Sequence, residues 1–220
     1  MTDGPSISGY RYANATPKHT HAYLMPAVRD ELASFFREAG EADRRVFELG
    51  CGNGSMAARL NDGGYEVSGV DPSSEGIAQA RAAYPGLRFE TGSAYDDLVA
   101  RFGRFPAVIS LEVVEHVYAP RDYARTLYDL VEPGGMALVS TPYHGYLKNL
   151  ALAVTGKFDA HFTALWDNGH IKFWSVATLA TLLTEAGFRD IRFRRIGRMP
   201  PLAKSMIAVA RKPGNTCDRN

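Results

Sequence analysis

The chain has 220 residues, of which 45% are hydrophobic and 22% charged, the balance of an ordinary globular domain with a full core. Its formal net charge of +1 gives no reason to expect a nucleic-acid partner. The two cysteines are too few for a disulfide framework, and the sequence opens with no signal-peptide pattern. One cysteine lies in a glycine-rich stretch and one in the polar tail, so we expect a reducing, cytoplasmic location. No apolar run reaches the ~18 residues of a transmembrane helix, so we expect no stable membrane insertion.

The first residues predict a polar arm followed by a helix. Residues 1–20 carry glycine, proline and polar side chains, and we expect them to be mobile. Residues 21–39 place apolar side chains at helical spacing, and Gly40 is a plausible stop. We expect a single domain over residues 1–220, which ends in a polar tail over residues 211–220.

An apolar strand then runs into a glycine-rich turn: residues 46–54 read Val-Phe-Glu-Leu-Gly-Cys-Gly-Asn-Gly. Glycines let a backbone turn tightly and approach a ligand, and here they are Gly50, Gly52 and Gly54. The spacing differs from the dinucleotide pattern, and no Lys-Ser or Lys-Thr follows to bind phosphate. Glu48 before the turn suits a cationic ligand better than a pyrophosphate.

A helix over residues 55–60 and a strand over residues 65–70 come next, and the strand ends at Asp71. At this place in a doubly wound sheet, an acidic side chain accepts hydrogen bonds from ribose hydroxyls. The alternation continues with helices over residues 74–83, 96–102 and 120–130, and strands over residues 87–90, 107–111 and 136–141. Strands separated by helices predict an α/β fold with a parallel sheet.

Acidic and imidazole side chains follow the fourth and fifth strands. Glu112, Glu115 and His116 come directly after residue 111, and His144 comes after the fifth strand. The carboxyl ends of parallel strands share one edge, where ligands bind. We expect Glu112 and His116, four residues apart, to share a helix face and to bind a divalent cation with Glu115. Two carboxylates favour a hard ion such as Mg2+.

Residues 143–174 interrupt the alternation with a dense group of aromatic and histidine side chains, which is typical of a substrate lid. Within them, residues 146–154 predict an amphipathic helix. A helix over residues 175–186 with Ser175 as N-cap follows. Strands over residues 188–196 and 205–210 complete the chain.

These motifs resemble the class I S-adenosylmethionine (SAM)-dependent methyltransferases, in order from residue 46 to residue 142. The glycine loop is similar to their first motif, and Val131-Glu-Pro-Gly-Gly to their turn before strand five. The Gly-Cys-Gly loop and the Glu-x-x-Glu-His segment are similar to the ubiquinone-biosynthesis O-methyltransferases, in which that segment is associated with a divalent metal. The likeness fades at the N-terminus and in residues 143–170, the parts that usually select the substrate in this family.

The resemblance implies a Rossmann-like seven-stranded sheet, mostly parallel with an antiparallel seventh strand, and helices on both faces. It implies SAM as cofactor, bound by Glu48, Gly50, Gly52, Gly54, Asp71, Pro72, Ser93, Ala94 and Leu111. It also implies a small-molecule methyl acceptor, either a quinol or catechol-like hydroxyl or a sugar hydroxyl, with Mg2+ assistance left open.

Three residues are the candidate catalytic groups, as proton acceptors or metal ligands: His144, His116 and Glu115. The metal set would be Glu112, Glu115 and His116, although similar Glu-His pairs also occur in metal-free relatives. An N-methyltransferase of secondary metabolism, a non-catalytic SAM-binding protein and a homodimer all remain open at this point.

Overall fold

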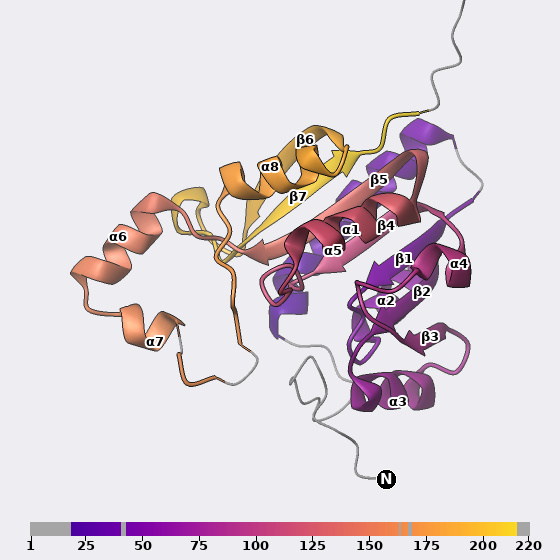
Figure 1. Ribbon diagram of the computed structural model, residues 1–220, viewed down its shortest axis with the longest axis horizontal. Coiled ribbons are helices and arrows are strands. Elements are labelled where there is room, and N and C mark those ends of the chain that lie inside the picture. Colours follow the sequence, from indigo (N-terminus) through magenta and orange to yellow (C-terminus); the bar gives the residue numbers. More distant parts are fainter. Residues whose placement is uncertain (1–18, 41–42, 163, 167–168, 215–220) are drawn as a thin grey trace, which may run out of the picture.

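The computed structural model describes residues 19–40, 43–162, 164–166 and 169–214, so the expected arm up to residue 18 and the tail from residue 215 lie outside the described residues. Seven strands form one sheet with helices on both sides (Figure 1). The strands are β1 Arg45–Leu49, β2 Glu66–Asp71, β3 Arg88–Thr91, β4 Phe105–Leu111, β5 Val131–Pro142, β6 Arg189–Ile196 and β7 Ser205–Arg211. The helices are α1 His19–Ala39, α2 Ser55–Asn61, α3 Ser74–Ala83, α4 Leu98–Phe102, α5 Pro120–Leu130, α6 Tyr146–Val154, α7 Phe158–Phe162 and α8 Val176–Glu185.

The strand order is β3-β2-β1-β4-β5-β7-β6. Strands β1 to β5 pair in parallel, whereas β7 pairs antiparallel with both β5 and β6. The expected fold class, with its antiparallel seventh strand beside the fifth, is therefore confirmed. The chain order reverses between β1 and β4, and such a switch point opens a crevice at the carboxyl ends of the strands.

Alternate side chains of each central strand pack into two different cores. In β1, Phe47 and Leu49 join the core under α4, α5 and α8, while Val46 joins the core under α1, α2 and α3. All three side chains are almost completely buried. Successive side chains of a strand point to opposite faces of the sheet, and here helices cover both faces. Both sets of side chains must therefore be apolar, which explains the continuous apolar run in the sequence.

Most element boundaries agree with the sequence prediction to within two residues. Ser175 caps α8 as expected: its hydroxyl accepts from the Thr178 backbone, and the Thr178 hydroxyl accepts from the Ser175 backbone. Strand β5 begins five residues earlier than predicted, since Val131 already pairs with Phe105. The short helix α7 and a 3-10 turn at Pro200–Leu202 were not predicted.

The expectation that Glu112 and His116 share a helix face is wrong. Residues 112–119 form turns and bends, and α5 begins only at Pro120. The Glu112 N–H pairs with Ser140, and Glu112 itself has a left-handed backbone with φ of 56°. A positive φ lies outside the right-handed helical region, so Glu112 cannot belong to a helix that begins directly after β4.

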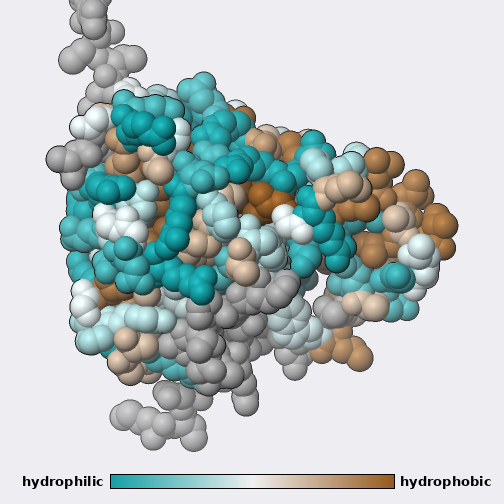
Figure 2. Space-filling view, turned by 180° about the vertical axis from the view of Figure 1, so that it is seen from behind, coloured by the Kyte–Doolittle hydropathy of each residue, from teal (hydrophilic) through white to brown (hydrophobic). Residues whose placement is uncertain are grey.

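The predicted helix over residues 146–154 is confirmed as α6, and it projects from the sheet together with α7 (Figure 1). Figure 2 shows apolar side chains gathered at this end of the molecule. Those with large exposed fractions are Tyr146, Leu147, Leu150, Val154 and Phe158. None of the helices in the described part of the chain combines the length and apolar character needed to cross a bilayer.

Candidate active site

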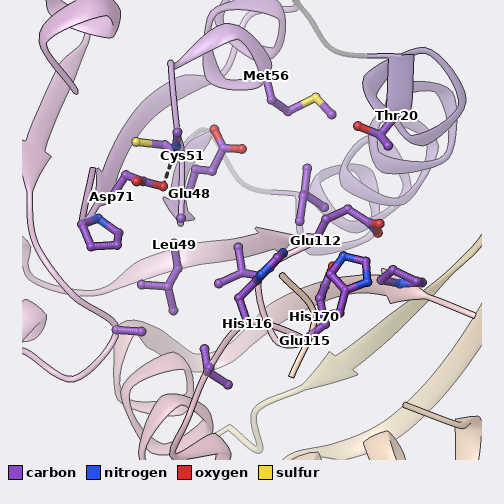
Figure 3. A pocket seen from close by; sticks show the side chains of 18 of the residues that line it. Thr20, Glu48, Leu49, Cys51, Met56, Asp71, Glu112, Glu115, His116 and His170 are labelled. Carbon is purple, nitrogen blue, oxygen red and sulfur yellow. Dashed lines mark hydrogen bonds and ion pairs between the residues drawn. The ribbon is translucent and has the colours of Figure 1, made fainter. Parts of the chain in front are cut away.

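A cavity of about 640 Å3 lies at the carboxyl ends of β1, β2 and β4, where the switch point of the sheet predicts a ligand site (Figure 3). Its volume is in the usual range for pockets that hold small molecules. Of the cofactor-binding residues expected from the sequence, all but one line it: Glu48, Gly50, Gly52, Asp71, Pro72, Ser93, Ala94 and Leu111.

The glycine loop is held against β2 by backbone hydrogen bonds. The N–H groups of Gly50 and Cys51 donate to the Val70 carbonyl, at 2.8 and 2.9 Å. A Cβ on Gly50 would lie 2.4 Å from the Val113 side chain, so this position accepts only glycine. The exception among the expected residues is Gly54, which caps α2 with φ of 73° and packs close to Phe89 instead of lining the cavity.

The buried carboxylate of Asp71 also holds the glycine loop in place, through a side-chain hydrogen bond. Its Oδ2 accepts from the Gly52 N–H at 2.9 Å, and its Oδ1 accepts from the Ser73 N–H at 2.8 Å. Each carboxylate oxygen has a second lone pair, so Asp71 can also accept from a ligand hydroxyl in the cavity. Asp71 therefore holds the glycine loop in shape and also lines the cavity.

Glu48 is almost completely buried, and its Oε2 has no hydrogen-bond partner among the described residues. Burial, and secondly the charge of Asp71, raise the pKa of Glu48 to about 8. An unsatisfied buried carboxyl at a cavity wall is destabilising unless a ligand donor or cation meets it. Glu48 therefore fits a ligand that brings a positively charged group to this wall.

Three other side chains that line the cavity lie close together, away from Glu48 and Asp71 (Figure 3): Glu115, His116 and His170. One ligand atom from each lies within 4.8 Å of the others. Burial, and secondly the neighbouring Glu112, raise the pKa of Glu115 well above its usual range. Burial, followed by the nearby imidazoles, lowers the pKa of His170 to about 4, so its ring is neutral near pH 7.

Glu112 also lines the cavity, but its carboxylate has other partners. It accepts hydrogen bonds from the Ser140 hydroxyl at 2.8 Å and from the Ser205 hydroxyl at 3.2 Å. Ser205 in turn lies 3.1 Å from the Tyr23 hydroxyl. Burial raises the pKa of Glu112 to about 7, although these serine bonds oppose the shift. Glu112 thus connects α1, β5 and β7 at the cavity edge.

His144 is not among the residues that line the cavity. Its ring stacks on Phe162 and meets Phe173 edge to face, with centroid distances of 5.7 and 5.1 Å. Burial, and secondly the charge of Lys148, lower the pKa of His144 to about 4. His144 thus belongs to the aromatic cluster that joins α7 to the segment after it.

The sequence prediction did not assign several residues that the fold brings to the cavity: Tyr23 and Ser205, which are 182 positions apart, and Asn53, Met56, Tyr118 and Lys204. Tyr23 lies in α1 and Ser205 begins β7. The sequence placed both in the correct elements, but only the order β5-β7-β6 brings the start of β7 beside Glu112.

The family model for the methyltransferase domain matches residues 19–192. The chain belongs to this family. It is a SAM-dependent methyltransferase, as the glycine loop and Asp71 predict. The match begins with α1 and extends into β6, so it covers most of the residues that line the cavity, but not Lys204 and Ser205 at the start of β7.

Several curated relatives carry the name ubiquinone biosynthesis O-methyltransferase. One, from Azorhizobium caulinodans, is 33% identical over 73% of this chain and 67% of its own length. Another, from Caulobacter sp. strain K31, is 36% identical over 63% of this chain and 57% of its own length. Among solved structures, a SAM-dependent methyltransferase from Archaeoglobus fulgidus has a TM-score of 0.65 at 17% identity and covers 86% of this chain and 93% of its own, which supports the fold.

Proposed function

We propose that the protein transfers the methyl group of SAM to a hydroxyl of a small molecule. The names of its curated relatives support O-methylation. The observation that carries the proposal is that the cofactor residues and the Glu115, His116 and His170 group face one another across the same cavity. Transfer requires the methyl donor and the acceptor oxygen to be held in line, and a shared cavity provides that proximity.

The cofactor side fits SAM on features of the structure itself. The unsatisfied Glu48 carboxylate suits an ammonium group, and the lone pairs of Asp71 suit ribose hydroxyls. Residues 92–95 line the cavity beyond Asp71 and suit the base. Bound SAM supplies a methyl group that its sulfonium already activates, so the protein has to position it and assist the acceptor.

On the acceptor side, a hydroxyl becomes a better nucleophile when a nearby group takes its proton. His116 and Glu115 line the cavity and are proposed for this role. His144 is outside the lining, so its proposed contribution is narrower: it holds the segment after α7 in place through Phe162 and Phe173. Tyr118 at the cavity offers an exposed aromatic ring on which a quinol, a catechol or the face of a sugar can pack.

The side chains present do not fit Mg2+ well. Both Glu112 oxygens accept from serine hydroxyls, and the remaining group has one carboxylate and two imidazoles. Mg2+ prefers oxygen ligands in a regular octahedron and keeps several waters. Proton transfer from the acceptor is therefore assigned to the protein groups themselves.

The test has a binding arm and a turnover arm. Calorimetry should show that SAM and S-adenosylhomocysteine both bind, and an acceptor panel should show S-adenosylhomocysteine release with a catechol. Glu115→Gln should keep cofactor affinity and reduce turnover by about 100-fold or more, because it removes a proton acceptor. The exposed Glu185→Gln, in α8, serves as the matched control.

Turnover with a matched aromatic amine and not with the catechol would replace O-methylation by N-methylation. Binding of both cofactor forms without turnover on any acceptor would instead indicate a non-catalytic SAM-binding protein.

A further inference from the structure

We propose that the methyl acceptor carries an anionic group, a carboxylate or a phosphate, which binds the ammonium of Lys204 at the β7 side of the cavity. This inference rests on the proposed methyl transfer and narrows the chemical class of its acceptor. Lys204 lines the cavity and directly precedes Ser205, the first residue of β7. The residue therefore has the right place to meet a ligand, and its surroundings decide which kind of ligand it suits.

The Lys204 side chain has no acidic partner within the described part of the chain, because none of the ion pairs found there includes it. Its Nζ lies 5.3 Å from the centre of the Tyr23 ring, and Tyr23 also lines the cavity. A ring face attracts an ammonium, but an ammonium carries three N–H donors that prefer oxygen acceptors. An anionic oxygen in the cavity can therefore accept a charge-assisted hydrogen bond from Lys204.

The hydroxyl groups beside Lys204 already use their protons. The Ser205 hydroxyl donates to the Glu112 Oε2 at 3.2 Å, and it lies 3.1 Å from the Tyr23 hydroxyl. Because Ser205 has a single proton, the Tyr23 hydroxyl is the donor in the second pair. The other Glu112 oxygen accepts from Ser140, so both oxygens of this carboxylate are occupied by hydroxyls. Lys204 is therefore the group at this edge that can donate to a ligand.

Three further cations gather around Tyr143, whose N–H donates to the Lys204 carbonyl at 3.0 Å. The Lys148 Nζ donates to the Tyr143 carbonyl at 2.8 Å, and the Arg195 guanidinium lies 5.6 Å from the centre of the Tyr143 ring. Burial, and secondly the charge of Arg198, lower the pKa of Lys148. These three side chains and Lys204 form the basic group, and none of its members has an ion pair among the residues that the structure describes. A cleft with one sign of charge attracts ligands of the other sign.

The arginines of β6 show that this lack of acidic partners is confined to one face of the strand. Arg192 and Arg194 both pair with Glu31 of α1. Arg195 follows Arg194, so its side chain points to the opposite face, where helix α6 contains no acidic residue. The Glu112 carboxylate is close enough to act on the basic group, but it balances one of four cations at most. The positive charge is therefore neutralised toward α1 and left in excess toward Tyr143.

An anion at Lys204 would help to orient the acceptor. The same cavity is lined by His116 and Glu115, the groups proposed to assist the acceptor hydroxyl. A small molecule that is held by a charged end has fewer orientations available, and a restricted orientation favours transfer in line with the methyl donor. Lys204 would thus act as a residue that determines specificity, by distinguishing anionic acceptors from neutral ones of similar shape.

Acceptor binding can be measured without turnover, by calorimetry on protein saturated with S-adenosylhomocysteine. One ligand series consists of catechols that differ in a single substituent: a carboxylate, a phosphate or a neutral methyl ester. A second series consists of glucuronate, a glucose phosphate and glucose. In at least one series, we expect an anionic ligand to bind at least ~10-fold more tightly than its neutral counterpart. The stronger of the two anionic ligands in that series identifies the group as a carboxylate or a phosphate.

Three lysine variants separate a specific contact from bulk charge. Lys204→Gln should reduce the preference for the anionic ligand to less than ~3-fold and leave the affinity for the neutral ligand and for S-adenosylhomocysteine unchanged. Lys148→Gln should have a smaller effect of the same sign, because Lys148 does not line the cavity. The matched control is Lys157→Gln, an exposed lysine after α6 that is also outside the cavity lining and should keep the full preference.

Equal affinity for anionic and neutral ligands in both series would overturn the proposal. So would a full preference in Lys204→Gln, or an equal loss of preference in Lys157→Gln. Turnover of neutral acceptors is measured separately: if they are methylated although no anionic preference exists, the acceptor class is wrong and the proposed methyl transfer stands. If anionic ligands bind through Lys204 but no acceptor is methylated, the proposed methyl transfer fails and the anion site stands.

Discussion

The two walls of the cavity are built in different ways. The wall that faces the cofactor comes mainly from one stretch, residues 48–72, whose loop, helix and strand contact one another in chain order. The wall that we propose faces the acceptor combines residues 112–118 with Trp166 and residues 169–171, and the Tyr23–Ser205 pair joins it from two distant parts of the chain.

The two walls therefore differ in whether they depend on contacts between residues close in sequence or on contacts between distant loops. The cofactor wall depends on backbone conformation and on bonds such as Gly52 to Asp71, which are fixed within twenty residues. The acceptor wall depends on the distance between loops that only the folded sheet brings together. We therefore expect changes in the first wall to affect folding and cofactor binding together, and changes in the second to affect acceptor chemistry alone.

The largest expected effect comes from Gly54→Val, at the end of the glycine loop and behind the cofactor wall. A branched side chain at φ of 73° is strained, and its Cβ would lie 2.8 Å from Phe89 and 2.9 Å from Ala80. We expect a loss of about 3 kcal/mol or more in the free energy of unfolding, measured by chemical denaturation. Gly86→Ala, where a Cβ meets nothing within 4 Å, should change it by less than ~1 kcal/mol. Equal stability of the two variants would contradict the packing argument.

Asp71→Ala should have the next largest effect. It removes acceptors from Gly52 and Ser73 as well as from the proposed ribose contact. We expect SAM affinity to fall by about 1–3 kcal/mol, roughly 10- to 100-fold, in calorimetry. The exposed Asp62→Ala, at the end of α2, should leave affinity unchanged. If Asp71→Ala binds SAM normally, the residue serves only the loop.

Glu48 gives the cofactor wall a pH dependence of definite sign. Its pKa is raised from 4.5 to about 8 in the folded protein, so the stability that its neutral form provides is present at low pH and is lost as pH rises toward about 8. Without ligand, the melting temperature of the wild type should therefore fall across this window, and more steeply than that of Glu48→Gln. If the melting temperatures of the wild type and of Glu48→Gln changed equally with pH, Glu48 would not have the raised pKa on which this prediction rests.

The smallest expected effect is the pH dependence of stability that His144 causes through its contact with α7. Its sign is opposite to that of Glu48, because stability is lost as pH falls. The pKa of His144 is lowered from 6.5 to about 4, so the folded protein loses stability as pH falls through this window. His144→Phe keeps the ring contacts with Phe162 and Phe173 and should flatten the acid side of the melting profile by a few degrees. A large loss of turnover at pH 7 in His144→Phe would instead restore it as a proton acceptor.

The pH profiles of the Glu48→Gln and His144→Phe melting temperatures can be combined to compare the cofactor wall with the aromatic cluster. The cofactor wall should lose stability with rising pH and the aromatic cluster with falling pH, so a double variant should show the flattest profile of all. Additive changes are expected, because Glu48 belongs to the glycine loop and His144 to a cluster outside the cavity lining.

The sequence by itself determined the sheet and the cofactor wall. Apolar runs with a period of two, glycines at positive φ and an acid at the end of β2 are local requirements, so they can be identified without knowing the rest of the fold. Ser175 as N-cap and the strand at Ser205–Arg211 were predictable for the same reason. The family's motifs then placed Ser93 and Ala94 beside Asp71.

Only the tertiary structure decided the acceptor wall. The spacing of Glu112 and His116 predicted a shared helix face, but Glu112 has a positive φ and pairs with Ser140, so it cannot belong to a helix there. His170 is 54 positions from His116 in the sequence, yet the Glu115 carbonyl fixes its loop against residues 114–116. Such long-range pairings depend on strand order and on loop anchoring, which no local pattern encodes, and they determine which side chains the acceptor meets.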